Sequence, residues 1–149
     1  MKFLIINGPN INMLGIREPD KYGHETYEEL LEKIKSHCAR RAITPEFYQS
    51  NHEGDLVDRI QQAYSDGTDA IVINPGAYTH TSIALLDAVK AVGIPTAEVH
   101  ISKLSEREDF RQISYIRAAC CFTVTGHGTD GYTEAIDYLM KKKEKENEC

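Results

Sequence analysis

The segment Ala70-Ile71-Val72-Ile73-Asn74 decides the fold of this chain. It is a continuous run of apolar residues of strand length that ends in a polar residue. Such runs are typical of a central strand that is buried on both faces, as in a parallel sheet with helices on each side. The segment therefore predicts an α/β protein built around a parallel sheet.

Apolar runs of similar length recur on both sides of this segment and alternate with segments of helical period. We expect the other strands at Lys2–Asn7, Thr44–Gln49, Thr96–Ile101 and Ala119–Thr125. Strict alternation of strands and helices predicts a flavodoxin-like, doubly wound parallel sheet in the order 2-1-3-4-5. The 149 residues suffice for one sizeable core and contain no linker or internal repeat, so we expect a single domain over residues 1–149.

The helices expected between these strands carry apolar stripes at helical spacing. The first begins near Thr26, where Thr26 and Glu29 have the spacing of a capping box. The next covers Glu53–Ser65, and the last begins near Thr129 and leads into a charged tail at residues 141–149. The expected stripes are Tyr27, Leu30, Leu31, Ile34 and Cys38; then Leu56, Val57, Ile60, Ala63 and Tyr64; and finally Tyr132, Ala135, Ile136, Leu139 and Met140.

Two further segments differ from the rest in composition: one is mostly apolar and the other is highly charged. The helix expected over Thr81–Val92 is apolar on most sides apart from Asp87 and Lys90, so we expect another subunit to cover part of it. The charged stretch Lys103–Arg111 follows the fourth strand and is expected to form a short helix or an ordered loop.

Composition narrows the class of protein. The chain is 41% hydrophobic and 27% charged, which is ordinary for a soluble globular protein, and its formal net charge of −6 disfavours a nucleic-acid partner. No apolar run approaches membrane-spanning length, and the first one is too short for a signal peptide.

The cysteines favour a reducing, cytoplasmic setting. Cys38, Cys120, Cys121 and Cys149 include no Cys-x-x-Cys pair, and a protein of this size folds without disulfide bonds. We expect Cys120 and Cys121 to be small core residues of the last strand.

Polar side chains collect where the first, third and fourth strands end. In a doubly wound sheet, ligands bind beyond the carboxyl ends of the strands where the strand order reverses. The loops after Asn7, Asn74 and His100 are therefore expected to converge on one crevice. The polar residues of these loops are Asn10, Asn12, Arg17, Tyr22, Tyr78, Thr79, His80, Ser102, Arg107 and Arg111.

Two pairs of residues expected at this crevice suit acid and base chemistry. Glu98 and His100 are two residues apart on a strand, so both side chains leave the same face, and the carboxylate favours a protonated imidazole that can act as a general acid. Tyr22 is a poor base alone, but Arg17 lies in the same loop and would favour the phenolate. The glycines that bound this loop, Gly15 and Gly23, suit a mobile lid.

Two other patterns could suggest a nucleotide site or a metal site. Residues 126–131 match G-x-G-x-x-G between a strand and a helix, but on the last strand, so we interpret them as a tight turn and a close helix start rather than a nucleotide site. His80, His100 and Glu98 could in principle hold zinc, yet no His-Glu-x-x-His or paired-cysteine spacing supports this, and no metal site is expected.

Several ordered motifs together resemble the type II 3-dehydroquinate dehydratases, over almost the whole chain from Lys2 to about Leu139. These motifs are Asn7–Gly15 (NGPNINMLG), Arg17–Pro19, Tyr22–Gly23, Gln49–Gly54 (QSNHEG), Asn74–Ser82, Glu98–Ser102 and Arg107–Arg111. The resemblance implies the anti elimination of water from 3-dehydroquinate through an enolate, giving 3-dehydroshikimate without a metal or cofactor. That step belongs to the shikimate pathway of aromatic amino acid and chorismate biosynthesis.

The same resemblance implies roles for individual residues. Tyr22 would remove the proton next to the ketone, Arg17 would favour its phenolate, and Asn10 would hold a water beside the enolate. His100, oriented by Glu98, would protonate the leaving hydroxyl. The substrate-binding residues would be Asn74, His80, Ile101, Ser102, Arg107 and Arg111, while Asp87 would reach the site of a neighbouring subunit in a dodecamer built of trimers.

Departures from the family pattern and two alternatives complete the expectations. Lys103 stands where the family commonly has asparagine, beside the expected carboxylate site, and the segment Ile116–Cys121 also diverges. One alternative is a flavin- or nucleotide-binding module of the same fold, although the loop Pro9–Asn12 lacks the hydroxyls of a flavodoxin phosphate loop. The other is a purely structural relative, against which the intact Tyr22, Arg17 and His100 argue.

Overall fold

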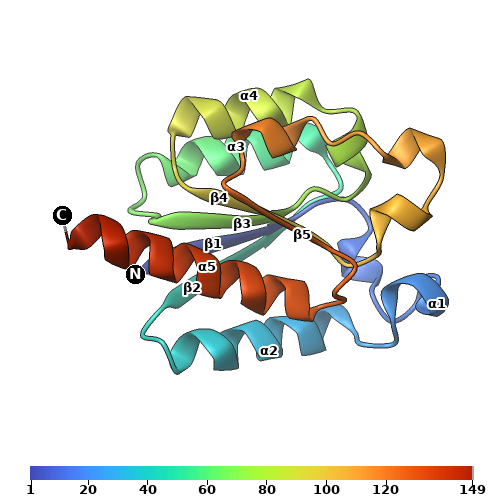
Figure 1. Ribbon diagram of the computed structural model, residues 1–149, viewed down its shortest axis with the longest axis horizontal. Helices are drawn as coiled ribbons and strands as arrows, with labels where there is room; N and C mark the ends of the chain where they lie inside the picture. The colour runs from blue at the N-terminus through green and yellow to red at the C-terminus, as the bar shows by residue number, and fades with distance from the viewer. Residues whose placement is uncertain (149) are drawn as a thin grey trace.

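A computed structural model describes residues 1–148, so Cys149 lies outside the described residues. Five parallel strands form one sheet in the order β2-β1-β3-β4-β5, which confirms the predicted topology (Figure 1). The strands are β1 (Lys2–Asn7), β2 (Thr44–Gln49), β3 (Ala70–Asn74), β4 (Thr96–His100) and β5 (Phe122–Thr125). The α-helices are α1 (Pro19–Tyr22), α2 (Tyr27–Ala39), α3 (Glu53–Ala63), α4 (Ile83–Val92) and α5 (Asp130–Asn147). The short 3-10 helices are η1 (Ile11–Met13), η2 (Gly76–His80), η3 (Leu104–Glu106), η4 (Asp109–Arg111) and η5 (Ile116–Ala119).

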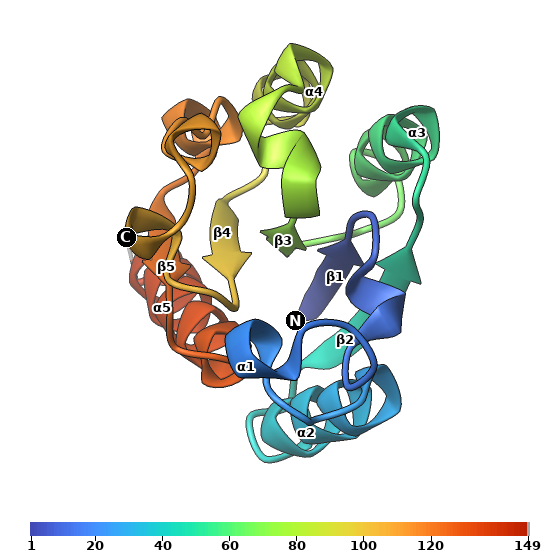
Figure 2. The same cartoon turned by 90° about the vertical axis from the view of Figure 1, so that its right-hand side faces the viewer.

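The sheet separates two apolar cores, because successive side chains of each strand point to opposite faces. Helices α3 and α4 cover one face, and α2 and α5 cover the other (Figures 1 and 2). On β1, Phe3 and Ile5 face α2 and α5, whereas Leu4 and Ile6 face α3 and α4. All five residues of β3 are buried, as its uninterrupted apolar sequence predicts.

Side-chain caps fix where two helices begin. The Thr26 hydroxyl accepts a hydrogen bond from the Glu29 backbone N–H at 3.1 Å, which is the first half of the predicted capping box. The Ser82 hydroxyl accepts from the Leu85 N–H at 3.0 Å, so α4 begins at Ile83 rather than at Thr81.

The helical stripes are mostly confirmed, with one error. Leu30, Ile34 and Cys38 of α2 are fully buried, as are Tyr132, Ala135, Ile136 and Leu139 of α5. Tyr64 was expected in the stripe of α3, but it is 75% exposed because α3 ends at Ala63 and the chain turns there.

The start of the last strand was also predicted wrongly. Residues 116–119 form η5, and β5 begins only at Phe122. The Cys120 N–H bonds to the Arg117 carbonyl at 3.1 Å, which continues the 3-10 turn instead of the sheet. Cys120 and Cys121 therefore precede the strand: Cys120 packs partly buried against the core under α4, and Cys121 is exposed.

This difference predicts how the thiols react. Burial raises the pKa of Cys38 to about 11 and that of Cys120 to about 12, so both stay protonated and unreactive at pH 8. We expect iodoacetamide to modify Cys121 well before Cys38 and Cys120, and to reach those two only after unfolding in guanidinium chloride. Peptide mass spectrometry with fragmentation between Cys120 and Cys121 measures this, and native-state labelling of Cys120 ahead of Cys121 would contradict it.

The glycine motif at residues 126–131 makes a tight turn, as its sequence predicts. Gly126 has φ +79°, and a Cβ there would lie 2.9 Å from the Cβ of Lys103. Gly131 lies in the first turn of α5, and a Cβ there would lie 3.3 Å from side-chain atoms of Val99 and Val124, so the helix starts close to the sheet. Among the helices formed by residues 1–148, none is long and apolar enough to cross a membrane.

Candidate active site

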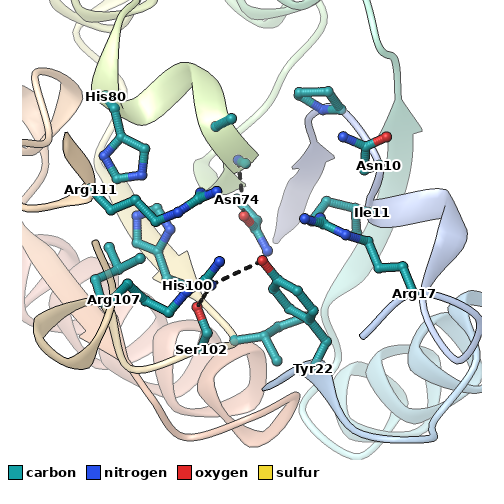
Figure 3. Close-up of a pocket in the computed structure, with 15 residues that line it drawn as sticks. Asn10, Ile11, Arg17, Tyr22, Asn74, His80, His100, Ser102, Arg107 and Arg111 are labelled. Atoms are coloured by element: carbon teal, nitrogen blue, oxygen red, sulfur yellow. Dashed lines mark hydrogen bonds between the residues drawn. The ribbon is translucent and has the colours of Figure 1, made fainter. Parts of the chain in front are cut away.

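The loops after β1, β3 and β4 converge at the carboxyl edge of the sheet, which faces the viewer in Figure 2. They enclose a cavity of about 180 Å³. Its lining includes all the predicted site residues except Glu98 and Asp87 (Figure 3). Those that line it are Asn10, Arg17, Tyr22, Asn74, His80, His100, Ile101, Ser102, Arg107 and Arg111.

Glycine allows the first two loops to meet. The Gly8 N–H donates to the Asn74 carbonyl at 2.8 Å, and a Cβ on Gly8 would lie 2.3 Å from the carbonyl oxygen of Pro75. Just beyond, Asn10 adopts a left-handed conformation with φ +69°, and its N–H donates to the Asn51 side chain at 3.0 Å. The loop geometry thus places Asn10 at the cavity wall.

Tyr22 ends helix α1 and points its hydroxyl into the cavity (Figure 3). Arg107 Nη1 donates to this hydroxyl at 3.0 Å and to the Ser102 hydroxyl at 3.1 Å. The guanidinium carbon of Arg17 instead lies over the tyrosine ring, 4.4 Å from its centroid. Arg107, rather than Arg17, is therefore the cation that bonds to the phenol oxygen.

Glu98 and His100 form a buried pair, with His100 at the cavity wall and Glu98 behind it. The distance from Glu98 Oε2 to His100 Nε2 is 2.5 Å, and Glu98 is fully buried. The carboxylate can only accept, so Nε2 carries the hydrogen and Nδ1 is left for a ligand. Burial alone would raise the pKa of the Glu98 carboxyl, but hydrogen bonds from His100, Arg117 and Ser114 outweigh burial and hold that pKa far below its usual range.

Further partners of Glu98 were not identified from the sequence as site residues. Arg117 Nε donates to Glu98 Oε1 at 2.9 Å, and the Ser114 hydroxyl donates to Oε2 at 2.6 Å. Thr123 lies on β5 directly beside Glu98 of β4, and its hydroxyl donates to Glu98 Oε1 at 3.2 Å. From the sequence, Thr123 could have been recognised as a partner of Glu98 only if the register of β4 and β5 had been known. The 3-10 turn that brings Arg117 to Glu98 has no recognisable sequence pattern.

Asn74 is held by a buried chain of hydrogen bonds. Its Nδ2 donates to the Tyr132 hydroxyl at 2.9 Å, and that hydroxyl donates to Asn7 Oδ1 at 2.6 Å. Its Oδ1 accepts from the Gly76 N–H at 3.1 Å. Burial raises the pKa of Tyr132, so the phenol keeps its proton and the orientation of the Asn74 amide is fixed.

Replacing Tyr132 with phenylalanine tests this chain. The change leaves Asn7 Oδ1 and Asn74 Nδ2 without their partner in a buried site, which costs about 1–3 kcal/mol. We expect urea denaturation to show that loss, while Tyr64→Phe at an exposed position changes stability by less than about 0.5 kcal/mol. Equal stabilities of the two variants would contradict the assigned network.

The far side of the cavity carries His80 and Arg111 (Figure 3). His80 Nδ1 lies 2.7 Å from the Ile113 carbonyl, which fixes the hydrogen on Nδ1. Burial lowers the pKa of His80, so the ring is neutral near pH 7 and Nε2 can accept a hydrogen bond. Arg111 pairs with Glu108 at 2.7 Å.

The charges that line the cavity suit an anionic ligand. Arg17, Arg107 and Arg111 all line it, and guanidinium groups bind carboxylates well. Within the described residues, no group of three or more histidine, cysteine, aspartate or glutamate side chains could hold a metal ion. Asp87 lies on an exposed face of α4, outside the cavity lining of this chain.

Comparisons with known proteins point to one family. The family model described as Dehydroquinase class II matches residues 1–140. A protein of Caldicellulosiruptor bescii named 3-dehydroquinate dehydratase is 50% identical over 141 residues, covering 95% of this chain and 97% of that protein. The crystal structure of type II dehydroquinase from Butyrivibrio crossotus has a TM-score of 0.92 at 54% identity, covering 93% of this chain and 97% of the other. The enzyme of the same type from Propionibacterium acnes has a TM-score of 0.90 at 36% identity, covering 94% and 96%.

Proposed function

Because the chain belongs to the class II dehydroquinase family, we propose that it removes water from 3-dehydroquinate to give 3-dehydroshikimate. One observation carries this proposal beyond family membership. A tyrosine hydroxyl bonded to an arginine and an imidazole bonded to a buried carboxylate line the same cavity. The first suits a base, the second suits an acid, and an elimination needs both.

The reaction begins at Tyr22. As phenolate, stabilised by Arg107 at 3.0 Å and by Arg17 over the ring, it removes the proton from the carbon next to the ketone. The electron pair of the broken C–H bond moves into the ketone and forms an enolate. Asn10, at the cavity wall, holds a water that donates to the enolate oxygen, and such placed donors lower the barrier to forming the charge.

The second step takes place at His100. The enolate returns its electron pair, the C–O bond of the hydroxyl breaks, and the imidazolium donates a proton so that water leaves. Glu98 stabilises the imidazolium and fixes the ring through the 2.5 Å contact to Nε2. The proton taken up by Tyr22 then passes through solvent back to His100, which restores both groups.

The remaining residues hold the substrate in place. Asn74, His80 and Arg111 bind its hydroxyl groups, and the backbone at Ile101 with the Ser102 hydroxyl receives its carboxylate. Arg107 bridges the Ser102 and Tyr22 hydroxyls, so it links the carboxylate end of the pocket to the base. Lys103, where the family commonly has asparagine, adjoins this end.

A direct assay tests the proposed activity. The purified protein, supplied with 3-dehydroquinate and a chelator, is expected to produce the ultraviolet absorbance of the conjugated enone. Folded protein that gives no signal would overturn the proposal. A yellow sample that carries stoichiometric flavin would instead support the alternative of a flavin-binding module.

The assembly and compartment belong to the same proposal. Ile83, Phe110 and Ile113 are each more than half exposed, and contact with other copies in a dodecamer of trimers would cover such apolar side chains. Asp87 on the exposed face of α4 would then reach a neighbouring copy's site. Mass measurement in solution tests the assembly. The free thiols fit a cytoplasmic protein, which cell fractionation tests.

A further inference from the structure

Arg117 contacts the acid pair without lining the cavity. It lies in η5, and its side chain is 44% exposed, whereas its partner Glu98 is fully buried. Nε donates to Glu98 Oε1 at 2.9 Å and Nη2 donates to Oε2 at 3.3 Å. The planar guanidinium thus bonds to both oxygens of the carboxylate, a geometry that a lysine cannot reproduce.

The carboxylate of Glu98 has two cationic partners when His100 is protonated. Oε2 accepts from His100 Nε2 at 2.5 Å and also from Arg117 Nη2. The neighbouring hydroxyls of Thr79, Ser114 and Thr123 are neutral donors, so they hold the carboxylate without competing for its charge. Arg117 and His100 therefore share one negative charge.

We propose that Arg117 is a positioning residue for the acid: it anchors the Glu98 carboxylate and competes with the His100 imidazolium for its charge. This inference rests on the proposed function, in which His100 donates a proton to the leaving hydroxyl. No role for Arg117 follows from the motifs, because the segment Ile116–Cys121 departs from the family pattern.

The consequence follows from counting charges. With Arg117 present, Glu98, Arg117 and His100 together carry no net charge when the imidazole is neutral and one positive charge when it is protonated. Without Arg117, protonation of His100 instead neutralises an unbalanced buried carboxylate. Loss of Arg117 therefore favours the imidazolium, extends its protonated form to higher pH and makes it a weaker proton donor.

Other titratable and charged groups also lie near Glu98 and His100. His80 of η2 and Arg111 of η4 lie across the cavity, Arg107 and Tyr22 line it, and the Cys120 thiol follows η5. Arg107 and Arg111 remain charged throughout the useful pH range, and burial keeps Cys120 protonated. The variants at residue 117 keep all of these residues, and loss of the Arg117 charge can only raise the pKa of Cys120 further, so that thiol stays protonated.

The experiment compares the pH dependence of kcat for wild type, Arg117→Ala and Arg117→Lys, with Arg40→Ala as a control at an exposed arginine. A half-exposed charge acts through partly screened contacts, so we expect Arg117→Ala to move the alkaline limb up by about half to one pH unit. Its kcat near pH 7 should fall about 3- to 10-fold with KM little changed. Arg117→Lys keeps the charge and should restore the wild-type limb, while Arg40→Ala should match wild type throughout.

A second readout separates this inference from the proposed function. The ring signals of His100 are followed by nuclear magnetic resonance, assigned by their absence in His100→Gln, and should titrate at higher pH in Arg117→Ala than in wild type. Inactive wild type with that shift intact would refute the dehydration but keep the charge competition. Folded Arg117→Ala with an unmoved alkaline limb and an unmoved His100 titration would overturn the inference.

Discussion

Replacing Tyr22 with phenylalanine is expected to lower kcat for 3-dehydroquinate by about 10²–10⁴-fold, the usual contribution of a general base. The change removes one oxygen atom and leaves the aromatic ring on which Arg17 lies. KM should change little, because the proposed mechanism assigns the substrate's hydroxyl groups and carboxylate to other residues of the cavity. Steady-state absorbance at saturating substrate measures the effect.

The controls for this variant distinguish chemistry from folding. Among the described residues, the Tyr22 hydroxyl accepts one hydrogen bond, from Arg107 at 3.0 Å, so the midpoint of thermal unfolding should change by only a few degrees. Tyr64→Phe, which removes the same atom from a side chain that is 75% exposed, should keep wild-type kcat. A Tyr22→Phe rate within threefold of wild type would refute Tyr22 as the base.

The fold was predictable because its central strands are short and apolar, and because strands alternate regularly with helices along the chain. The apolar runs Phe3–Ile6 of β1 and Ala70–Ile73 of β3 are typical of central strands between two helical layers. The strand order followed from the alternation of strands with helices along the chain. The same reasoning located the cavity, since a reversal of strand order between β1 and β3 places a crevice at their carboxyl ends.

The detail of the site depends on geometry that no local pattern encodes. Sequence proximity suggested that Arg17 would be the cation that favours the Tyr22 phenolate, because the two residues share a loop. The structure places Arg17 over the ring and brings Arg107 to the oxygen from 85 residues away. Contacts of this range depend on how α1 and the segment after β4 pack, which is a tertiary property.

The start of β5 illustrates a different limit. Residues 119–125 have the composition of a strand, yet η5 occupies the first of them, and the Cys120 N–H bonds within the turn. The same turn brings Arg117 to Glu98. Thus η5, which made the predicted start of β5 wrong, also supplies a second cation to the buried carboxylate. Apolar composition alone does not distinguish a 3-10 turn from a strand end.

Replacing His100 with glutamine is expected to lower kcat by about 10²–10⁴-fold, because the amide cannot donate a proton to the leaving hydroxyl. Glutamine is preferable to alanine, since its N–H can still donate to the buried Glu98 carboxylate that loses the bond from Nε2. Removing one partner of a buried ion pair without a substitute donor costs about 3–5 kcal/mol and would confound the rate with unfolding.

Two measurements test whether His100 is the acid. His127→Gln changes a histidine whose side chain is 57% exposed and should retain wild-type kcat and stability. If His100 acts on the leaving hydroxyl and not on the first proton, His100→Gln should still exchange the proton next to the ketone with deuterium from solvent, whereas Tyr22→Phe should not. Loss of that exchange in folded His100→Gln, or wild-type turnover by it, would show that the acid lies elsewhere.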